Sequence, residues 1–287
     1  MKKILVTGGA GFIGSHLCER LVSKDTEVFS LDNYSTGSKN NHVEGVKYIK
    51  GETSNIDSII DFIPNEIYHL GEYSRVEQSF SDIDSVIQSN KIGTCMVLEF
   101  CRKNNVKLIY AGSSTKFGDN GLNKKESPYA WSKYSNSELI ANYGDWYSLN
   151  YVIVYFYNAY GPREISQGKY STVIGLFAQK MKNNQPLTVV SPGTQRRNFT
   201  HVKDIVSGLI LAAEKGYGDG YGIGNSESFS IIEIAKLFGG NIEMLPERKG
   251  NRLTAEVMNK KISDLGWSPT VSINEYINQI KSKNWEI

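Results

Sequence analysis

The sequence predicts an α/β protein built on a doubly wound parallel sheet, with a smaller α/β region at the C-terminal end. Three observations support this prediction. Short apolar runs alternate with helical patterns in the first half, glycines follow the first run directly, and the simple alternation stops after residue 162. Such alternation implies right-handed crossovers between parallel strands, and these sheets bind ligands at the carboxyl ends of their strands.

The expected elements are read from the apolar runs and the periodic segments. Strands are expected at Ile4–Val6, Glu27–Leu31, Val46–Lys50, Glu66–Leu70, Val106–Ala111, Tyr151–Tyr157 and Leu187–Val190. Helices are expected at Ser15–Ser23, at about 84–104, from Pro128 to about Trp146 and at Ile231–Phe238. A capping box of Ser230 and Glu233 opens the last of these helices.

The composition is that of an ordinary globular protein. Of 287 residues, 40% are hydrophobic and 22% are charged, and the formal net charge is +2. This near balance does not indicate nucleic acid or a membrane surface as a partner, and no apolar run is long enough to span a bilayer. The three cysteines, Cys18, Cys95 and Cys101, lack metal-ligand spacing and do not suggest a disulfide framework. We therefore expect a cytoplasmic protein with no signal peptide and no metal site.

A glycine-rich turn follows the first expected strand. Gly8, Gly11 and Gly14 are spaced Gly-x-x-Gly-x-x-Gly, and a helical pattern begins directly after them. In a strand–turn–helix context the first glycine allows a tight turn, the second lets the backbone approach a pyrophosphate, and the third lets the helix pack closely. The turn therefore predicts a phosphate cradle for a dinucleotide.

Asp32 ends the second expected strand, 18 residues after Gly14. An acid at this place can accept hydrogen bonds from an adenosine ribose and would repel a 2′-phosphate, which favours NAD over NADP. The alternative is a solvated acid at a strand end.

Tyr129 and Lys133 stand four positions apart in a segment with a helical pattern, in which Pro128 suits the first turn. Side chains at i and i+4 share one helix face, and an ammonium beside a phenol favours the phenolate, a general base near neutral pH. A chain with 17 tyrosines can also produce this spacing by chance. Ser113, at a strand end 16 residues before Tyr129, is the expected hydrogen-bond partner for a substrate hydroxyl, unless it only caps a turn.

Taken together, these motifs resemble the extended short-chain dehydrogenase/reductase family. The glycine turn, Asp32, His69-Leu70, Ser113-Ser114 and Tyr129-x-x-x-Lys133 occur in the family's order. Within the family the chain is similar to the NAD-dependent nucleotide-sugar epimerases and dehydratases, most of all to the UDP-hexose 4-epimerases. The resemblance implies a Rossmann-type sheet, NAD as cofactor and a nucleotide sugar as substrate.

The resemblance also implies which residues bind each ligand, with Tyr129, Lys133 and Ser113 as the catalytic group. The expected cofactor contacts are Gly8, Gly11, Phe12, Ile13, Gly14, Asp32, Asn33, Glu52, Thr53, Leu70, Gly71, Tyr129 and Lys133. The expected substrate contacts are Ser113, Ser114, Tyr129, Asn158, Val173, Arg197 and Arg248. The two arginines resemble family residues that hold the substrate's phosphates, and a forked, permanently charged guanidinium suits a diphosphate. Asn198 stands where the family usually has an aspartate.

The resemblance implies oxidation at C4 of the sugar as the first step, and the later steps depend on further acid/base groups. Dehydratases of the family carry an Asp-Glu pair just after the position of Ser113, and glucuronate decarboxylases typically carry a Glu two residues after it. Reductase/epimerases that act at C3 and C5 usually place a catalytic Cys near this strand end. This chain has Ser114 and Thr115 after Ser113, and its Cys95 and Cys101 belong to the preceding helix. We therefore expect 4-epimerisation through a transient 4-keto sugar, which needs none of these additional groups.

Several alternatives stay open. A 4,6-dehydratase, a decarboxylase or a 4-dehydrogenase of the same family would share the first step, whereas a non-catalytic NAD-sensing protein would typically have lost Tyr129 or Lys133. Glu72 replaces a residue that is usually small, and the connection from Ser113 to Tyr129 is shorter than usual, so the sugar can differ. Ala255 resembles the residue that gates the C2 substituent, and its small side chain suggests room for an N-acetyl group.

The expected dinucleotide-binding domain comprises residues 1–162 with returning segments at about 195–228. The substrate domain comprises residues 163–194 and 229–287. Relatives often dimerise by packing two long helices from each subunit into a bundle. The segments 84–104 and 129–146 could serve this purpose, so we expect a homodimer.

Overall fold

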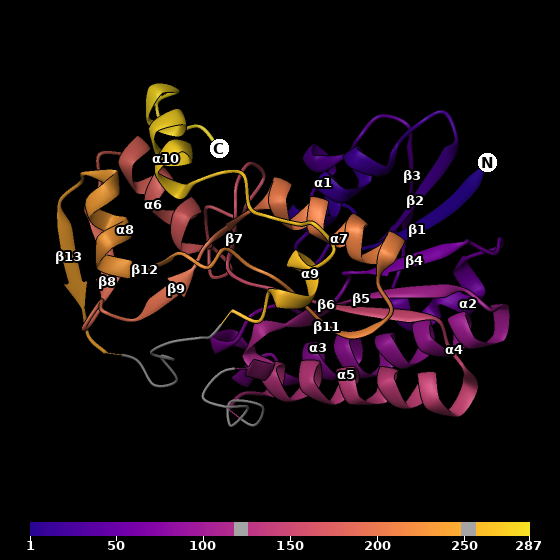
Figure 1. Ribbon diagram of the computed structural model, residues 1–287. Coiled ribbons are helices and arrows are strands. Elements are labelled where there is room, and N and C mark those ends of the chain that lie inside the picture. The colour runs from indigo at the N-terminus through magenta and orange to yellow at the C-terminus, as the bar shows by residue number, and fades with distance from the viewer. Residues whose placement is uncertain (118–125, 248–256) are drawn as a thin grey trace.

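Seven parallel strands form one central sheet in the computed structural model, which describes residues 1–117, 126–247 and 257–287 (Figure 1). The strand order is β11-β6-β5-β4-β1-β2-β3. Their bounds are β1 Lys2–Thr7, β2 Thr26–Asp32, β3 Val46–Lys50, β4 Glu66–His69, β5 Lys107–Ser113, β6 Tyr151–Phe156 and β11 Gly218–Ile223. The order reverses between β1 and β4, and ligands of such sheets bind in the crevice at this switch point.

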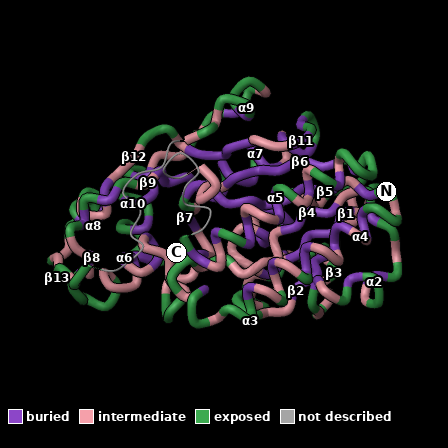
Figure 2. The backbone as a smooth tube through the Cα atoms, turned by 90° about the horizontal axis from the view of Figure 1, so that it is seen from below, coloured by how far each residue is buried: buried purple, intermediate pink, exposed green. Residues whose placement is uncertain are grey.

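Helices cover both faces of the sheet. On one face lie α1 (Phe12–Leu21) and α7 (Val202–Lys215), and on the other lie α2 (Ile56–Ile59), α4 (Thr94–Asn104) and α5 (Pro128–Tyr147) (Figure 1). Alternate strand residues serve the two faces, as the period of two requires. In β1, Ile4 and Val6 pack under α1 and α7, whereas Leu5 packs toward α4 and α5. Figure 2 shows the resulting buried centre of the sheet.

The segment expected as one helix at 84–104 is helical throughout but not uniform. It consists of α3 (Ile83–Val86), a π-helical stretch η4 (Ile87–Gly93) and α4. Within η4 the buried Asn90 side chain accepts from Tyr73 N at 2.7 Å and donates to Ser132 Oγ at 2.9 Å. Through Asn90, the wider π-helical turn connects the loop after β4 with α5. A sequence period of 3.6 residues indicates a helix but cannot reveal such a turn.

The C-terminal region has a separate core. Its short sheets pair β8 (Leu187–Val190) with β13 (Ile242–Leu245), β9 (Arg196–Asn198) with β12 (Ser228–Ser230), and β7 (Ala159–Tyr160) with β10 (Thr200–His201). Apolar faces of α6 (Val173–Lys182), α8 (Ile231–Phe238) and α10 (Ile273–Ser282) close over these strands. The predicted capping box of Ser230 and Glu233 is present at the start of α8. Other short helices among the described residues include η1 (Lys39–Asn41), η2 (Thr53–Asn55), η3 (Glu77–Phe80) and α9 (Lys260–Ser263).

The chain returns to the large sheet before it ends. Ile262 and Trp267, within the range 229–287 expected for the substrate domain, pack in the core formed by α1, α7 and the sheet. The core of the large sheet therefore includes residues from both of the expected domains. Within the described residues, no helix is long and apolar enough to cross a membrane.

Asp204 fastens this returning segment to α7. Its carboxylate is 2% exposed and accepts hydrogen bonds from Thr270 Oγ1 at 2.6 Å and Val271 N at 3.0 Å. Its backbone oxygen accepts from Trp267 Nε1 at 3.0 Å.

Replacing Asp204→Ala leaves two donors without their acceptor, so we expect the free energy of unfolding to fall by about 1–3 kcal/mol in a urea titration. The matched control is Asp264→Ala, which removes an exposed carboxylate that pairs with Lys260 in α9. A control change of about 0.5 kcal/mol or less is expected. Equal losses in both variants would show that the buried carboxylate is not the anchor.

Candidate active site

A cavity of about 1000 Å³ opens at the carboxyl edge of the sheet, between the sheet and the C-terminal region. Every predicted cofactor or substrate residue that the structure describes lines this cavity. They are Gly8, Gly11, Phe12, Ile13, Gly14, Asp32, Asn33, Glu52, Thr53, Leu70, Gly71, Ser113, Ser114, Tyr129, Lys133, Asn158, Val173 and Arg197. Arg248 and Ala255 lie outside the described residues. The structure therefore gathers the predicted group, whose individual roles stay predictions.

The glycine turn leaves no room for side chains. Gly8 has a φ of +75°, and a Cβ on it would lie 2.9 Å from the backbone of Gly71. A Cβ on Gly14 would lie 2.1 Å from the carbonyl oxygen of Gly8. The helix α1 starts after Gly11, which has no side chain to cap the first N–H groups. These N–H groups and the helix dipole suit a pyrophosphate, so the residues present fit a dinucleotide.

Asp32 is held at the end of β2 by backbone donors. Its Oδ2 accepts from Ala10 N at 2.9 Å and its Oδ1 from Tyr34 N at 2.8 Å. Burial raises the pKa of Asp32, and these two hydrogen bonds oppose the rise. Asp32 lines the cavity, and its carboxylate has lone pairs left to accept further hydrogen bonds, so its contact with a ribose stays a prediction.

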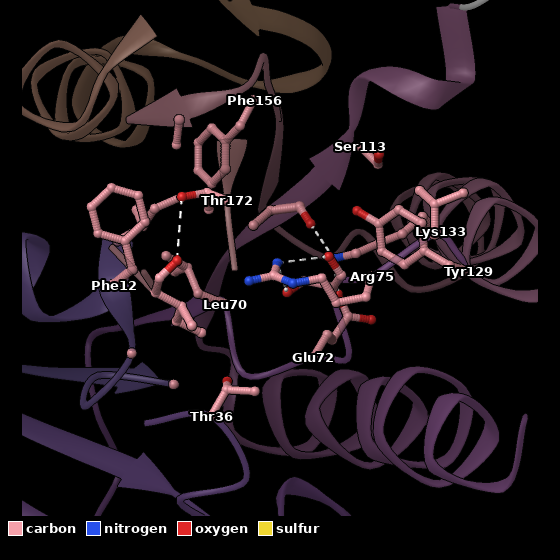
Figure 3. Close-up of a pocket in the computed structure, with 18 of the residues that line it drawn as sticks. Phe12, Thr36, Leu70, Glu72, Arg75, Ser113, Tyr129, Lys133, Phe156 and Thr172 are labelled. Atoms are coloured by element: carbon pink, nitrogen blue, oxygen red, sulfur yellow. Dashed lines mark hydrogen bonds and ion pairs between the residues drawn. The ribbon is translucent and has the colours of Figure 1, made fainter. Parts of the chain in front are cut away.

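The helix α5 begins as its sequence predicts. Ser127 is the N-cap, its Oγ accepts from Ala130 N at 3.1 Å, and Pro128 occupies the first turn. This cap sets the start of the helix and therefore the face on which Tyr129 and Lys133 both lie. Figure 3 shows the two side chains in the cavity together with Ser113.

The ammonium group of Lys133 is held in place at the wall of the cavity. Its Nζ donates to the carboxylate of Glu72 and to the carbonyl oxygen of Ala111, the latter at 2.6 Å. The Lys133 side chain is 7% exposed and the Glu72 side chain is 1% exposed. The sequence shows only that Glu72 replaces a residue that is usually small in the family. It does not indicate that Glu72 forms a buried ion pair with Lys133.

Ser113 is the last residue of β5, two positions beyond the expected strand end, and is 8% exposed. Its Oγ accepts from Thr115 N at 3.3 Å and from Thr115 Oγ1 at 3.0 Å. Because both contacts use the oxygen as acceptor, its own hydrogen can be donated to a substrate oxygen. The hydroxyl-rich strand end is thus a local turn that lines the cavity, and the role of Ser113 as a donor to substrate stays a prediction.

His69 supports the site without facing it. The ring lies between Thr7 Oγ1 at 2.7 Å and Thr94 Oγ1 at 3.0 Å. Burial lowers the pKa of His69 to about 4, so the ring is neutral near pH 7. It ties β1, β4 and α4 together.

The wall opposite α5 comes from the C-terminal region. Arg197, in β9, and Val173, in α6, line the cavity there. The unusual Asn198 has a structural use: its amide donates to the carbonyl oxygens of Asn225, Ser226 and Glu227 at 3.0–3.3 Å. A carboxylate cannot donate, so the asparagine accounts for this loop arrangement. Asn158 in turn donates to Asn198 O at 3.1 Å.

Arg75 is a cavity residue that the sequence reasoning missed, since a lone arginine in a loop carries no signal. Its guanidinium donates to Tyr170 O at 2.7 Å and 3.0 Å and to Ser74 O at 3.1 Å. Among the described residues, no acidic side chain forms an ion pair with it. Burial lowers the pKa of Arg75, and the nearby phenols of Tyr129, Tyr73 and Tyr170 act in the opposite direction. The cavity therefore holds a second cation near Tyr129 (Figure 3).

This arrangement suits oxidation of an alcohol beside a dinucleotide. As phenolate, a tyrosine next to a fixed ammonium can take up a proton, a serine hydroxyl can donate to the oxygen that loses it, and the glycine turn can hold the phosphates. No cluster of His, Cys, Asp and Glu side chains that could hold a metal ion occurs in the part of the chain that the structure describes.

The chain is similar along nearly its whole length to known proteins. The model of the "NAD dependent epimerase/dehydratase family" matches residues 4–224. The chain is 32% identical to a Methanocaldococcus jannaschii protein named "Putative UDP-glucose 4-epimerase", over 98% of this chain and 97% of that one. It is 27% identical to UDP-glucuronic acid decarboxylase 1 of Xenopus tropicalis, over 97% of this chain and 71% of that one.

A solved structure leads to the same family. The UDP-glucose 4-epimerase of Thermotoga maritima, solved with UDP-glucose, matches with a TM-score of 0.90 and 27% identity, over 99% of this chain and 100% of that one. The chain therefore belongs to the NAD-dependent epimerase/dehydratase family and is an enzyme that modifies nucleotide sugars with NAD as its cofactor.

Proposed function

We propose that the enzyme catalyses 4-epimerisation of a nucleotide-activated hexose through a transient 4-keto sugar. The observation that carries the proposal is the composition of the catalytic edge. Tyr129 and Lys133 share one face of α5, and Ser113 ends the neighbouring strand β5. The two residues after Ser113 are the hydroxyl residues Ser114 and Thr115, where an elimination or a decarboxylation would call for an acid.

In the proposed mechanism Tyr129, as phenolate, accepts the proton of the 4-hydroxyl. When bound, NAD would accept the hydride from C4 and later return it to the other face of the 4-keto sugar. The Ser113 hydroxyl donates to the sugar oxygen as it becomes a ketone. Once the 4-keto sugar has turned over, Tyr129 returns the proton to the C4 oxygen. The cycle is redox neutral.

Arg197 supports a diphosphate-linked substrate, because its guanidinium lies on the wall opposite α5. We propose UDP as the nucleotide, with a plain hexose such as glucose or galactose, or its N-acetylated equivalent, as the sugar. The relatives named as UDP-glucose 4-epimerases support this choice.

A nucleotide hexuronic acid is the second candidate substrate, and Arg75 favours it. A half-buried guanidinium without an acidic partner among the described residues suits an anionic group, such as a C6 carboxylate, near the C4 oxygen at Tyr129. The decarboxylase relative acts on a substrate of this kind by its name. After oxidation at C4, such a sugar could either return as the 4-epimer or lose its carboxylate as CO2.

For Tyr129→Phe we expect turnover to fall by about 10²–10⁴-fold, because the proton acceptor is removed, while NAD remains bound. The holoenzyme is incubated without added cofactor with each of five substrates: UDP-glucose, UDP-galactose, their N-acetyl equivalents and UDP-glucuronic acid. The products are identified by NMR. The control Tyr147→Phe changes an exposed tyrosine on the same helix.

The product identifies the reaction. A 4-epimer supports the proposal. A pentose with CO2 would establish decarboxylation, a 4-keto-6-deoxy sugar would establish dehydration, and a lasting rise at the NADH absorbance band would establish a dehydrogenase. Unchanged turnover in Tyr129→Phe would contradict the mechanism itself.

For Asp32→Ala we expect NAD to bind about 10–100-fold more weakly, since hydrogen bonds to a charged acceptor are lost, and NADP to be excluded less strongly. Titration of the apoprotein with each dinucleotide measures both effects. Asp25→Ala, at the opposite end of β2, is the control. A preference for NAD that survives Asp32→Ala would assign the discrimination to other residues.

We also propose a homodimer formed by the segments 84–104 and 129–146. Large apolar side chains exposed on this side support it: Ile83, Ile92, Trp131 and Trp146 are 41–60% exposed. Sedimentation equilibrium should give twice the mass of the chain, and Trp146→Glu should lower that value.

A further inference from the structure

Glu72 is a buried carboxylate on the loop after β4, beside the catalytic lysine. Its side chain is 1% exposed, and it lines the cavity together with Lys133 (Figure 3). Transferring an ionised carboxylate out of water costs several kcal/mol unless it is paired and fully hydrogen-bonded. Its position in the cavity therefore requires a specific set of partners.

Four side chains from three elements donate to this carboxylate. Lys133 Nζ, on α5, donates to Oε2. Oε1 accepts from Thr94 Oγ1 at 2.8 Å, Asn136 Nδ2 at 3.0 Å and Tyr110 Oη at 3.2 Å. These partners lie on α4, α5 and β5. With both oxygens engaged, the carboxylate has one position, and so has the ammonium that it holds.

The pairing changes what Lys133 offers to the cavity. Of its three N–H donors, one is directed at Glu72 and one at the carbonyl oxygen of Ala111. One donor is left for the cofactor or for Tyr129. The positive charge is also partly cancelled, because an opposite charge lies in direct contact where little water can screen the pair.

We propose that Glu72 is a positioning residue that fixes Lys133 and lowers the net positive charge acting on Tyr129 and on the nicotinamide end of the cofactor site. This inference rests on the proposed function for its effect on turnover. A smaller positive charge favours the phenolate less. It also favours the cationic, oxidised nicotinamide over the neutral, reduced one. The first effect makes Tyr129 readier to accept a proton, and the second suits an enzyme whose cofactor must end each cycle oxidised.

The other charged or titratable groups around the pair hold one state near neutral pH. His69, from β4, is neutral because burial lowers its pKa to about 4. Burial raises the pKa of Tyr110, from β5, well above its ordinary value, so this phenol stays protonated. Lys91, from η4, donates to Asn136 and Ser135. Arg75, on the same loop as Glu72, lies near Tyr129 (Figure 3), and an arginine side chain keeps its charge near neutral pH.

The first test measures the resting redox state of bound NAD in Glu72→Gln holoenzyme, with no sugar present. The variant keeps the shape of the side chain and removes its charge. At a fixed external redox couple, we expect the ratio of bound NADH to bound NAD, read from absorbance, to rise about tenfold. This corresponds to about 1.4 kcal/mol of lost preference for the oxidised form.

The second measurement is the pH dependence of kcat with the substrate found in the panel. In Glu72→Gln the pH of half-maximal kcat should fall by about one unit, since an uncompensated ammonium favours the phenolate more strongly. Glu72→Asp retains the charge and should keep both readouts near those of the unchanged enzyme.

The matched controls are Tyr110→Phe and Thr94→Val, which each remove one donor to Glu72 but leave its charge. They should lower thermal stability without moving the NADH ratio or the pH of half-maximal kcat. If Glu72→Gln does not fold, Glu72→Ala, which leaves room for water beside Lys133, carries the same expectations.

The outcomes separate this inference from the proposed function. An unchanged NADH ratio and pH profile in a folded Glu72→Gln or Glu72→Ala would overturn the role of Glu72, even if epimerisation occurs. A shifted ratio in an enzyme that epimerises no nucleotide sugar would overturn the proposed function and leave the role of Glu72 standing. If Tyr110→Phe and Thr94→Val shift the NADH ratio and the pH profile as much as Glu72→Gln does, the charge of Glu72 has no special role and the residue acts only through packing.

Discussion

The close approach of two backbones at the switch point of the sheet is the constraint on which the site depends. Gly8, after β1, and Gly71, after β4, pass so near each other that a Cβ on either would lie about 2.9 Å from the other's backbone. Because the strand order reverses between these two strands, their following loops diverge and leave a crevice. Side chains at the two glycines would force the strands apart at the place where the dinucleotide must enter.

The sequence predicts the parts of this site that are built locally. The N-cap Ser127 and Pro128 set the start of α5, so the spacing of Tyr129 and Lys133 translates directly into a shared face. The glycine turn and Asp32 likewise depend on a strand and on the few residues that come after it. In each case the positions of the side chains are set by residues close in sequence, so helix propensity and residue spacing are enough to predict them.

The parts that could not be predicted depend on residues far apart in the chain. The donors to Glu72 stand at positions 94, 110, 133 and 136, so no local pattern connects them with a loop after β4. Arg75 enters the cavity because its guanidinium contacts Tyr170, 95 positions further on. The strand β5 ends at Ser113, two residues later than its apolar run indicates, for a related reason, since pairing with Phe156 of β6 extends it.

The return of the chain to the large sheet has a consequence for how the molecule can be divided. The core of the C-terminal region takes Phe177 from α6, Phe238 from α8 and Tyr276 from α10. Between these contributions the chain goes back to add α7 and β11 to the large sheet, and later to bury Trp267 there. No single cut in the sequence therefore yields either part whole. A fragment that ends after β11 would carry all seven strands of the parallel sheet and the wall residues Val173 and Arg197. It would lack α8 and α10, so the wall opposite α5 would stand without the helices that complete its core.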